Sequence, residues 1–179
     1  MLDANSNALN DSNAAMSVIR SLAASGGEDG LTEVASLLQQ LASSPHWKNL
    51  LWPAALPGEE LLYELAVSPG CASLYLVSDG SGVISPPHEH GTWAVIAGLR
   101  GKEANCLYQR VVAGQVVPME RVVVGPGEFM VLASTAIHST EVVGTEPTFH
   151  LHLYGKPLNE LASFGSRVFA RHDAKGADA

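Results

Sequence analysis

From about residue 70 to residue 154, short stretches rich in Val, Leu, Tyr and Thr alternate with turns rich in Gly, Pro and Asp. No segment between them is long enough for a helix that would connect parallel strands, so we expect antiparallel neighbours. Several short strands at this spacing are typical of a β-sandwich or a β-barrel. We predict seven strands, over residues 72–78, 92–99, 104–112, 115–124, 128–134, 138–143 and 148–154.

The first sixty residues have a helical pattern instead. From Leu31 to Leu41, leucines and Val34 recur at helical spacing. Thr32 is a candidate N-cap, and the SSP sequence at 43–45 ends the pattern. An earlier helix is predicted to end at Gly26 and Gly27. We therefore expect three parts. An N-terminal helical segment at residues 1–60 packs on a barrel formed by residues 61–160, and a C-terminal extension at residues 161–179 ends in a partly disordered tail.

The composition narrows the class of protein. With 179 residues, of which 46% are hydrophobic and 16% charged, the chain can bury one good-sized core. A net charge of −8 argues against a nucleic-acid partner, which would require a basic face. No apolar run approaches the roughly 20 residues that cross a bilayer, and the first residues lack the layout of a secretory signal. We expect a cytoplasmic protein with no membrane partner, and the oligomeric state is left open.

Two histidines stand one residue apart in the sequence SPPHEHGTW. Side chains at positions i and i+2 of a strand share a face, so His88 and His90 can chelate one metal ion, while Glu89 points away. A third ligand must come from elsewhere. His138 follows fifty residues after His88 on another predicted strand, a normal separation when a barrel brings its walls together.

The last predicted strand, TFHLHLY, has two contrasting faces. Its apolar face carries Phe149, Leu151 and Leu153, and its other face carries His150, His152 and Tyr154. Two interpretations remain open for the polar face. It is either a satisfied hydrogen-bond network inside a barrel or a set of groups that bind metal, donate hydrogen bonds or move protons.

These residues match the pattern of a family. The run GVISPPHEHGTWAVIAGLRG resembles the first cupin motif, although Ala94 stands where the cupin glutamate ligand would fall. The second motif is fainter, since Gly127 and His138 keep their spacing but Ala133 and Thr135 replace its Pro and Gly. The positions of the first motif that are in register are Gly82, His88, His90 and Gly101.

A cupin with three histidines and no acidic ligand resembles the thiol dioxygenases, namely cysteine dioxygenase and the bacterial 3-mercaptopropionate dioxygenases. The stretches HEHGTW and GLRG are similar to the HDHxTW…LxG stretch of that family, and FHLHLYG is similar to its Ser-x-His-x-Tyr segment. The resemblance covers roughly residues 60–157.

The resemblance implies an all-β cupin fold, a double-stranded β-helix or jelly-roll barrel, preceded by α-helices. It implies an Fe(II) enzyme that uses O2 to oxidise a small thiol, cysteine or a mercapto acid, to its sulfinic acid. It also implies that His152 and Tyr154 lie near the substrate and oxygen, with His152 orienting the phenol, and that Trp93 forms part of the pocket wall. The implied iron ligands are His88, His90 and His138.

Two departures from the family affect the substrate. The family's serine is replaced by His150, which gives a His-His-Tyr set. The upstream Arg or Gln that would face a substrate carboxylate is absent, because no Lys, Arg or Gln occurs between Lys48 and Arg100. A buried carboxylate needs a partner that is charged or that donates several hydrogen bonds, so the sequence leaves the identity of the thiol substrate open. Candidate partners from elsewhere in the chain are Arg110, Arg121 and Arg167.

Two other functions remain compatible with this sequence. One is a metal cupin with different chemistry, such as an isomerase, a lyase or a hydrolase. The other is a cupin without catalytic activity that binds a ligand or a metal.

Overall fold

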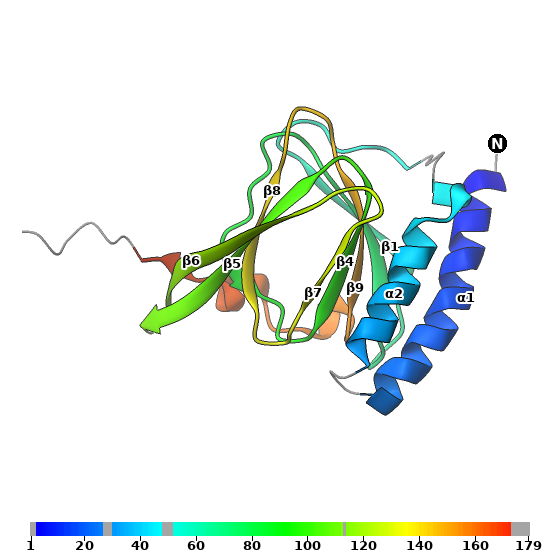
Figure 1. Ribbon diagram of the computed structural model, residues 1–179, viewed down its shortest axis with the longest axis horizontal. Coiled ribbons are helices and arrows are strands. Elements are labelled where there is room, and N and C mark those ends of the chain that lie inside the picture. Colours follow the sequence, from blue (N-terminus) through cyan, green and yellow to red (C-terminus); the bar gives the residue numbers. More distant parts are fainter. Residues whose placement is uncertain (1–2, 27–29, 48–51, 113, 173–179) are drawn as a thin grey trace, which may run out of the picture.

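The computed structural model describes residues 3–26, 30–47, 52–112 and 114–172, and its centre is a pair of facing β-sheets (Figure 1). One five-stranded sheet, sheet A, has the order β1 (Glu60–Ala66), β2 (Ser73–Asp79), β9 (Phe149–Tyr154), β4 (Ala94–Arg100) and β7 (Phe129–Leu132). The other, sheet B, has the order β10 (Ala170–Arg171), β6 (Gln115–Val124), β5 (Glu103–Val112), β8 (Ile137–Val142) and β3 (His88–Glu89).

The chain passes repeatedly from one sheet to the other. Strands β2, β4, β7 and β9 lie in sheet A, and β3, β5, β6 and β8 lie in sheet B, so most neighbours within a sheet are not consecutive in sequence. This interleaving is that of a double-stranded β-helix, so the fold that the resemblance implies is confirmed. All seven predicted strands are present, with their ends displaced by two residues at most. Every strand pair is antiparallel except β10 with β6.

Two helices, α1 (Asp3–Gly26) and α2 (Leu31–Ala42), cover the outer face of sheet A (Figure 1). Because β9 alternates its side chains, Phe149, Leu151 and Leu153 point to these helices and the histidines point into the barrel. This explains why β2 and β9 are buried on both faces. The helical residues that complete this core include Ala8, Met16, Ile19, Val34, Ala35 and Leu38.

The helix boundaries differ partly from the sequence prediction. Helix α1 ends at Gly26 as predicted but begins at Asp3, because Ala8 and Ser12 continue its buried face toward the N-terminus. The predicted Thr32 cap is wrong. Helix α2 begins at Leu31, and its N-cap is Gly30, whose backbone carbonyl accepts the hydrogen bond of Val34 without a side-chain cap.

The connection between helices and barrel packs against the same core. In the short 3-10 helix η1 (Pro45–Trp47), Trp47 is 3% exposed, and its ring stacks on Trp52 at a centroid distance of 5.8 Å. Both tryptophans thus pack on the core beneath the helices. Neither α1 nor α2 is apolar enough over a sufficient length to cross a membrane, and no other described helix is.

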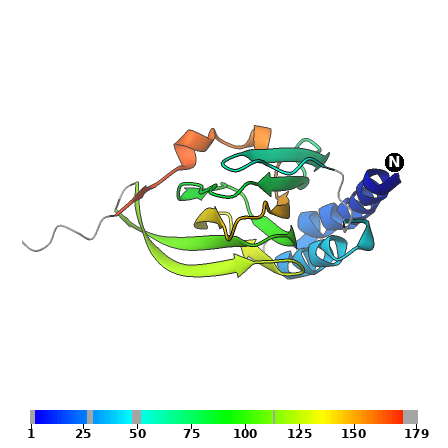
Figure 2. The ribbon, with the colours of Figure 1, turned by 90° about the horizontal axis from the view of Figure 1, so that it is seen from above.

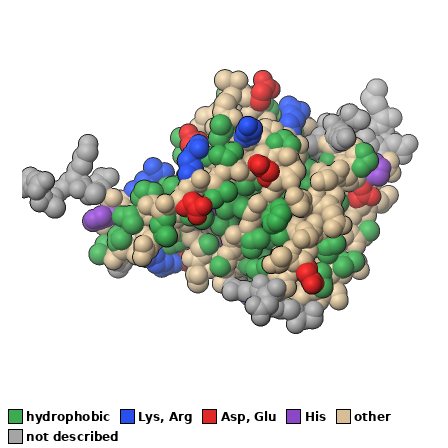
Figure 3. Space-filling view, viewed as in Figure 1, with side chains coloured by type: hydrophobic (Ala, Val, Ile, Leu, Met, Phe, Trp, Pro, Cys, Tyr) green, Lys and Arg blue, Asp and Glu red, His purple; other side chains and the backbone are tan. Residues whose placement is uncertain are grey.

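The C-terminal extension lies on the barrel opposite the N-terminal helices (Figure 2). The 3-10 helix η2 (Leu158–Glu160) precedes it, and the extension itself contains the 3-10 helix η3 (Phe164–Arg167), followed by β10 on the edge of sheet B. The backbone N–H of Phe169 donates to Pro87 at 2.8 Å, which holds the extension beside β3. On the face seen in Figure 3, acidic and basic side chains are interspersed among apolar ones.

Candidate metal centre

Three histidines converge where β3 meets β8. The antiparallel register places His88 directly opposite His138, and His90 follows two residues after His88 on the same face. Gly91, with φ of +69°, then turns the chain toward β4 in the other sheet, a conformation that side-chain-bearing residues rarely adopt. Glu89 points away, as predicted, and its carboxylate pairs with Arg110.

The three rings form a compact triangle. Their centroids lie 5.1 Å apart for His88 and His90, 4.6 Å for His88 and His138, and 4.9 Å for His90 and His138. One ligand nitrogen from each lies within 4.8 Å of the others, and all three residues are buried. They form a histidine cluster that can hold one ion.

Hydrogen bonds fix which nitrogen faces the centre of the cluster. His88 donates from Nδ1 to the carbonyl of Pro86 at 2.9 Å, and His138 donates from Nδ1 to Asn105 Oδ1 at 2.8 Å. Asn105 in turn donates to Glu103 Oε1 at 2.9 Å, which sets the orientation of its amide. The Nε2 atoms of His88 and His138 therefore carry lone pairs.

Burial keeps these imidazoles neutral. Desolvation lowers the pKa of His88, lowers that of His90 to about 3 and lowers that of His138 well below its usual value. His138 Nε2 lies 3.3 Å from His90 Nε2. At this distance the two nitrogens can share either a proton or a cation. Neutral imidazoles with oriented lone pairs fit a divalent transition metal such as iron, zinc, copper or nickel.

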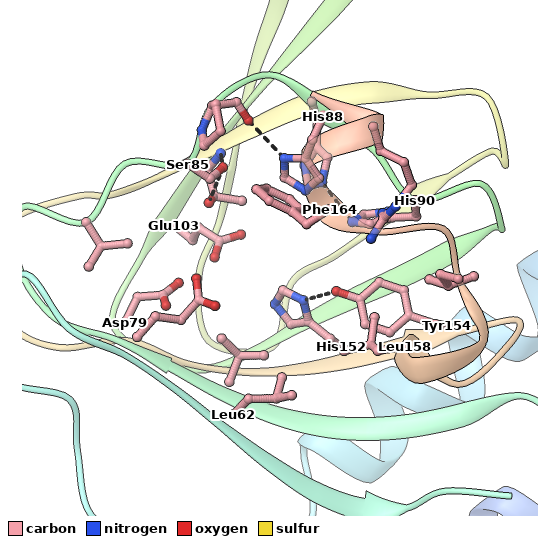
Figure 4. Close-up of a pocket in the computed structure, with 18 of the residues that line it drawn as sticks. Leu62, Asp79, Ser85, His88, His90, Glu103, His152, Tyr154, Leu158 and Phe164 are labelled. Carbon is pink, nitrogen blue, oxygen red and sulfur yellow. Dashed lines mark hydrogen bonds between the residues drawn. The ribbon is translucent and has the colours of Figure 1, made fainter. Parts of the chain in front are cut away.

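The cluster opens into a cavity of about 630 Å³ between the two sheets (Figure 4). The C-terminal extension closes one side of this cavity, and the ring of Phe164 lies 5.0 Å from that of His88. Apolar lining residues include Leu62, Val77, Val83, Leu158 and Leu161.

His152 and Tyr154 lie beside the cluster, on the inner face of β9. Tyr154 has its ring 4.9 Å from that of His90, and its hydroxyl is 3.0 Å from His152 Nδ1 (Figure 4). Burial raises the pKa of Tyr154 far above its usual value and lowers that of His152 well below, so both are neutral. Because the bond uses one of their two protons, one donor remains, at His152 Nε2 or at the Tyr154 hydroxyl. His152 Nε2 is buried and has no partner among the described residues.

The structure places His150 and Trp93 away from the cavity. His150 shares a face with His152, but its Nε2 is 3.1 Å from the carbonyl of Val124 and it does not line the cavity. Trp93 packs on the core beneath the helices, and its Nε1 lies so close to Gly155 that a Cβ there would be 2.6 Å away. Trp93 is therefore not among the residues that line this cavity.

Of the three arginines, only Arg167 lines the cavity. It donates from Nε to Ala162 at 2.8 Å and from Nη1 to the backbone carbonyl of Glu89 at 2.7 Å. Arg110 instead lies over the Phe169 ring and pairs with Glu89, and Arg121 faces Glu141 at 3.7 Å on the exposed surface.

The sequence interpretation missed Asp79, Glu103 and Asn105. Asp79 stands in a DGSG sequence that reads as a turn, but β2 continues through it, so its side chain points inward like those of Tyr75 and Val77. Glu103 and Asn105 lie on the same face of β5 as Leu107. Glu103 was missed because the predicted strand begins at residue 104, one residue too late, so the alternation of Glu103 with Asn105 was not recognised.

No protein-family model and no curated protein sequence matches the chain. Solved structures similar to it include KdgF from Halomonas, at 16% identity and a TM-score of 0.47 over 60% of this chain and 90% of that one. A cupin superfamily protein from Desulfitobacterium hafniense has 15% identity and a TM-score of 0.47 over 69% and 88%. An oxalate oxidase in complex with the substrate analogue glycolate has 21% identity and a TM-score of 0.47 over 61% and 58%. These resemblances concern the fold alone.

Proposed function

We propose that the protein is an Fe(II)-dependent dioxygenase that oxidises a small thiol to its sulfinic acid. The observation that carries the proposal is the ligand set: three neutral imidazoles converge at the wall of a cavity, and no carboxylate joins them among the described residues. A set without a negative ligand leaves the metal charge uncompensated, which favours an anionic thiolate as the incoming ligand.

The reaction is RSH + O2 → RSO2⁻ + H⁺, in which the sulfur loses four electrons and both oxygen atoms are transferred to it. Iron would supply the acidification of the thiol and the activation of O2. The protein supplies the rest. The apolar walls formed by Leu62, Val77 and Leu158 limit water around the reacting atoms.

His152 and Tyr154 supply a hydrogen-bond donor beside the cluster. Their single remaining donor is fixed by the 3.0 Å bond between them and faces the cavity. It can stabilise negative charge that develops on oxygen beside the cluster, because a preorganised donor in a buried site does so without reorganisation. His150 takes no part in this proposal.

Arg167 is the candidate partner for a substrate carboxylate. Two of its nitrogens hold backbone carbonyls, and Nη2 has no hydrogen bond in the part of the chain that the structure describes. The charge of Arg167 also acts on His88 and His90, which places it at the histidine end of the cavity. A mercapto acid or cysteine could therefore meet the cluster and this guanidinium together.

Metal analysis and oxygen uptake test the proposal. The full chain is purified, its metals are measured, and it is then loaded with Fe(II) under anaerobic conditions. Oxygen consumption is recorded with cysteine, 3-mercaptopropionate, 2-aminoethanethiol and 2-mercaptoethanol. We expect thiol-dependent uptake and a sulfinate product that carries two labelled atoms from ¹⁸O2.

Two outcomes would overturn it. Another metal bound in the purified chain, with no thiol-dependent uptake after iron loading, would favour an isomerase, a lyase or a hydrolase. A chain that binds no metal would favour a ligand-binding protein without catalytic activity.

A further inference from the structure

The cavity has a second buried polar group, across from the histidine cluster. Asp79 comes from β2 in sheet A and Glu103 from β5 in sheet B, and their carboxyl groups face each other (Figure 4). Their exposed fractions are 3% and 1%. We call these two residues the carboxyl pair.

The carboxyl pair has few donors apart from a proton shared between its own two groups. Asp79 and Glu103 hydrogen-bond each other and Asn105 donates to Glu103 Oε1, but no N–H or O–H of another described residue reaches Asp79 Oδ1 or Glu103 Oε2. The neighbouring charge that acts on both is also acidic, namely Glu60 on β1. An uncompensated carboxylate in such a place is costly, so the pair retains a proton when the cavity holds no cation.

The missing partner is a cation with several N–H donors. Asp79 and Glu103 line a cavity that is otherwise mostly apolar, which suits an ammonium group on a short carbon chain that displaces the proton between them. A second metal ion fits less well. Among the described residues only the histidine cluster brings three ligand atoms of His, Cys, Asp or Glu close enough to share an ion.

We propose that the carboxyl pair binds the protonated amine of the substrate, so that the preferred substrate is a small thiol bearing an amine. The identity of the thiol end depends on the proposed function, but the amine subsite stands on the carboxyl pair alone. The cavity thus separates three functions: the histidine cluster takes sulfur, the carboxyl pair takes the ammonium, and Arg167 takes a carboxylate where one is present.

Cysteine and 3-mercaptopropionate are a matched pair for the kinetic test, because they differ only by the amine. The same holds for 2-aminoethanethiol and ethanethiol. We expect kcat/KM to favour the amine in each pair by roughly tenfold or more. Asp79→Asn and Glu103→Gln should each reduce that preference by about tenfold, because each removes one carboxylate from the amine subsite. The control is Glu141→Gln, which removes an exposed carboxylate that faces Arg121.

A binding measurement keeps this proposal separate from the proposed function. Butylammonium, butanol and butyrate are titrated into the ¹⁵N-labelled full chain, and the Asn105 side-chain amide signal is followed, since that amide is bonded to Glu103. We expect butylammonium alone to shift it, with binding roughly tenfold weaker in both carboxyl variants. Equal binding of butanol, an unchanged affinity in the variants, or displacement of butylammonium by Mg²⁺ or Ca²⁺ would overturn the subsite. Amine binding without uptake of oxygen by any thiol would overturn the proposed function and leave the subsite standing.

Discussion

The histidine cluster and the carboxyl pair are both buried in one cavity, but burial acts on them in opposite directions. It removes the positive charge from imidazoles, lowering the pKa of His90 to about 3, and removes the negative charge from carboxyls, raising the pKa of Asp79 to about 8. Both ends are therefore close to neutral in the free cavity, and each is ready for a cation that restores the lost interactions. The difference is in the cation: lone pairs of nitrogen suit a transition metal, and carboxylate oxygens suit an ammonium.

Removal of one histidine ligand is expected to have the largest effect. In His88→Ala or His138→Ala only two imidazoles remain, so we expect the metal to be lost on purification and activity to fall below detection. Metal content by mass spectrometry and oxygen uptake measure this. The control is His172→Ala, since His172 is exposed and bonds Gln115 instead. A metal content equal to that of the wild type would remove the substituted residue from the ligand set.

Tyr154→Phe should separate metal binding from turnover at the histidine end. The phenol lies next to His90 but is not one of the ligands, so we expect normal metal content and kcat lower by roughly 100-fold, a typical size for a lost catalytic proton donor. Tyr108→Phe is the matched control, because Tyr108 is also buried but packs in a separate cluster with Val116 and Ile137 and bonds Ser139, away from the cavity lining. Full activity of Tyr154→Phe would leave the phenol without a role in the reaction.

The same contrast explains what could be predicted from the sequence. His88 and His90 belong to one motif, and His150, His152 and Tyr154 alternate along one strand, so the period of two was enough to assign their common faces. Asp79 and Glu103 come from strands in different sheets and are not adjacent in any motif. Their meeting depends on how the sheets face each other, and the extension of β2 through Asp79 depends on its pairing with Glu60 on β1, a strand that was not predicted. The position of Phe164 in the cavity wall was hidden for the same reason, whereas Arg167 was already a candidate from the sequence.

Asn105 connects the two ends, and its removal should weaken both. In Asn105→Ala, His138 Nδ1 loses its acceptor and Glu103 loses its donor, so the ring is no longer held with Nε2 toward the cluster. We expect metal affinity to fall by about 10- to 100-fold, the usual cost of losing such a partner. Competition with a chelator measures it. Asn159→Ala is the control, because Asn159 also lines the cavity. An unchanged affinity would show that His138 is oriented by packing alone.

The smallest effect that we predict is on stability. Burial raises the pKa of Asp79 to about 8 and that of Glu103 to about 7, so between pH 4 and these values the folded chain binds more protons than the unfolded chain. When the folded state binds more protons, stability falls as pH rises, and this loss accumulates from about pH 4 to about pH 8. Asp79→Asn carries no charge at either pH. We therefore expect it to gain about 1–3 kcal/mol of unfolding free energy over the wild type between pH 4.5 and pH 8.

The comparison of variant and wild type isolates the carboxyl pair from the histidines. Buried imidazoles with lowered pKa values destabilise the fold below about pH 6.5, but they do so equally in both chains. Urea unfolding at several pH values measures the difference between the two chains, with Glu141→Gln as the exposed control. Parallel curves would mean that the carboxyl pair is already charged and compensated in the folded protein. An ammonium ligand would then gain little binding energy there, because another positive charge would already compensate the carboxylates.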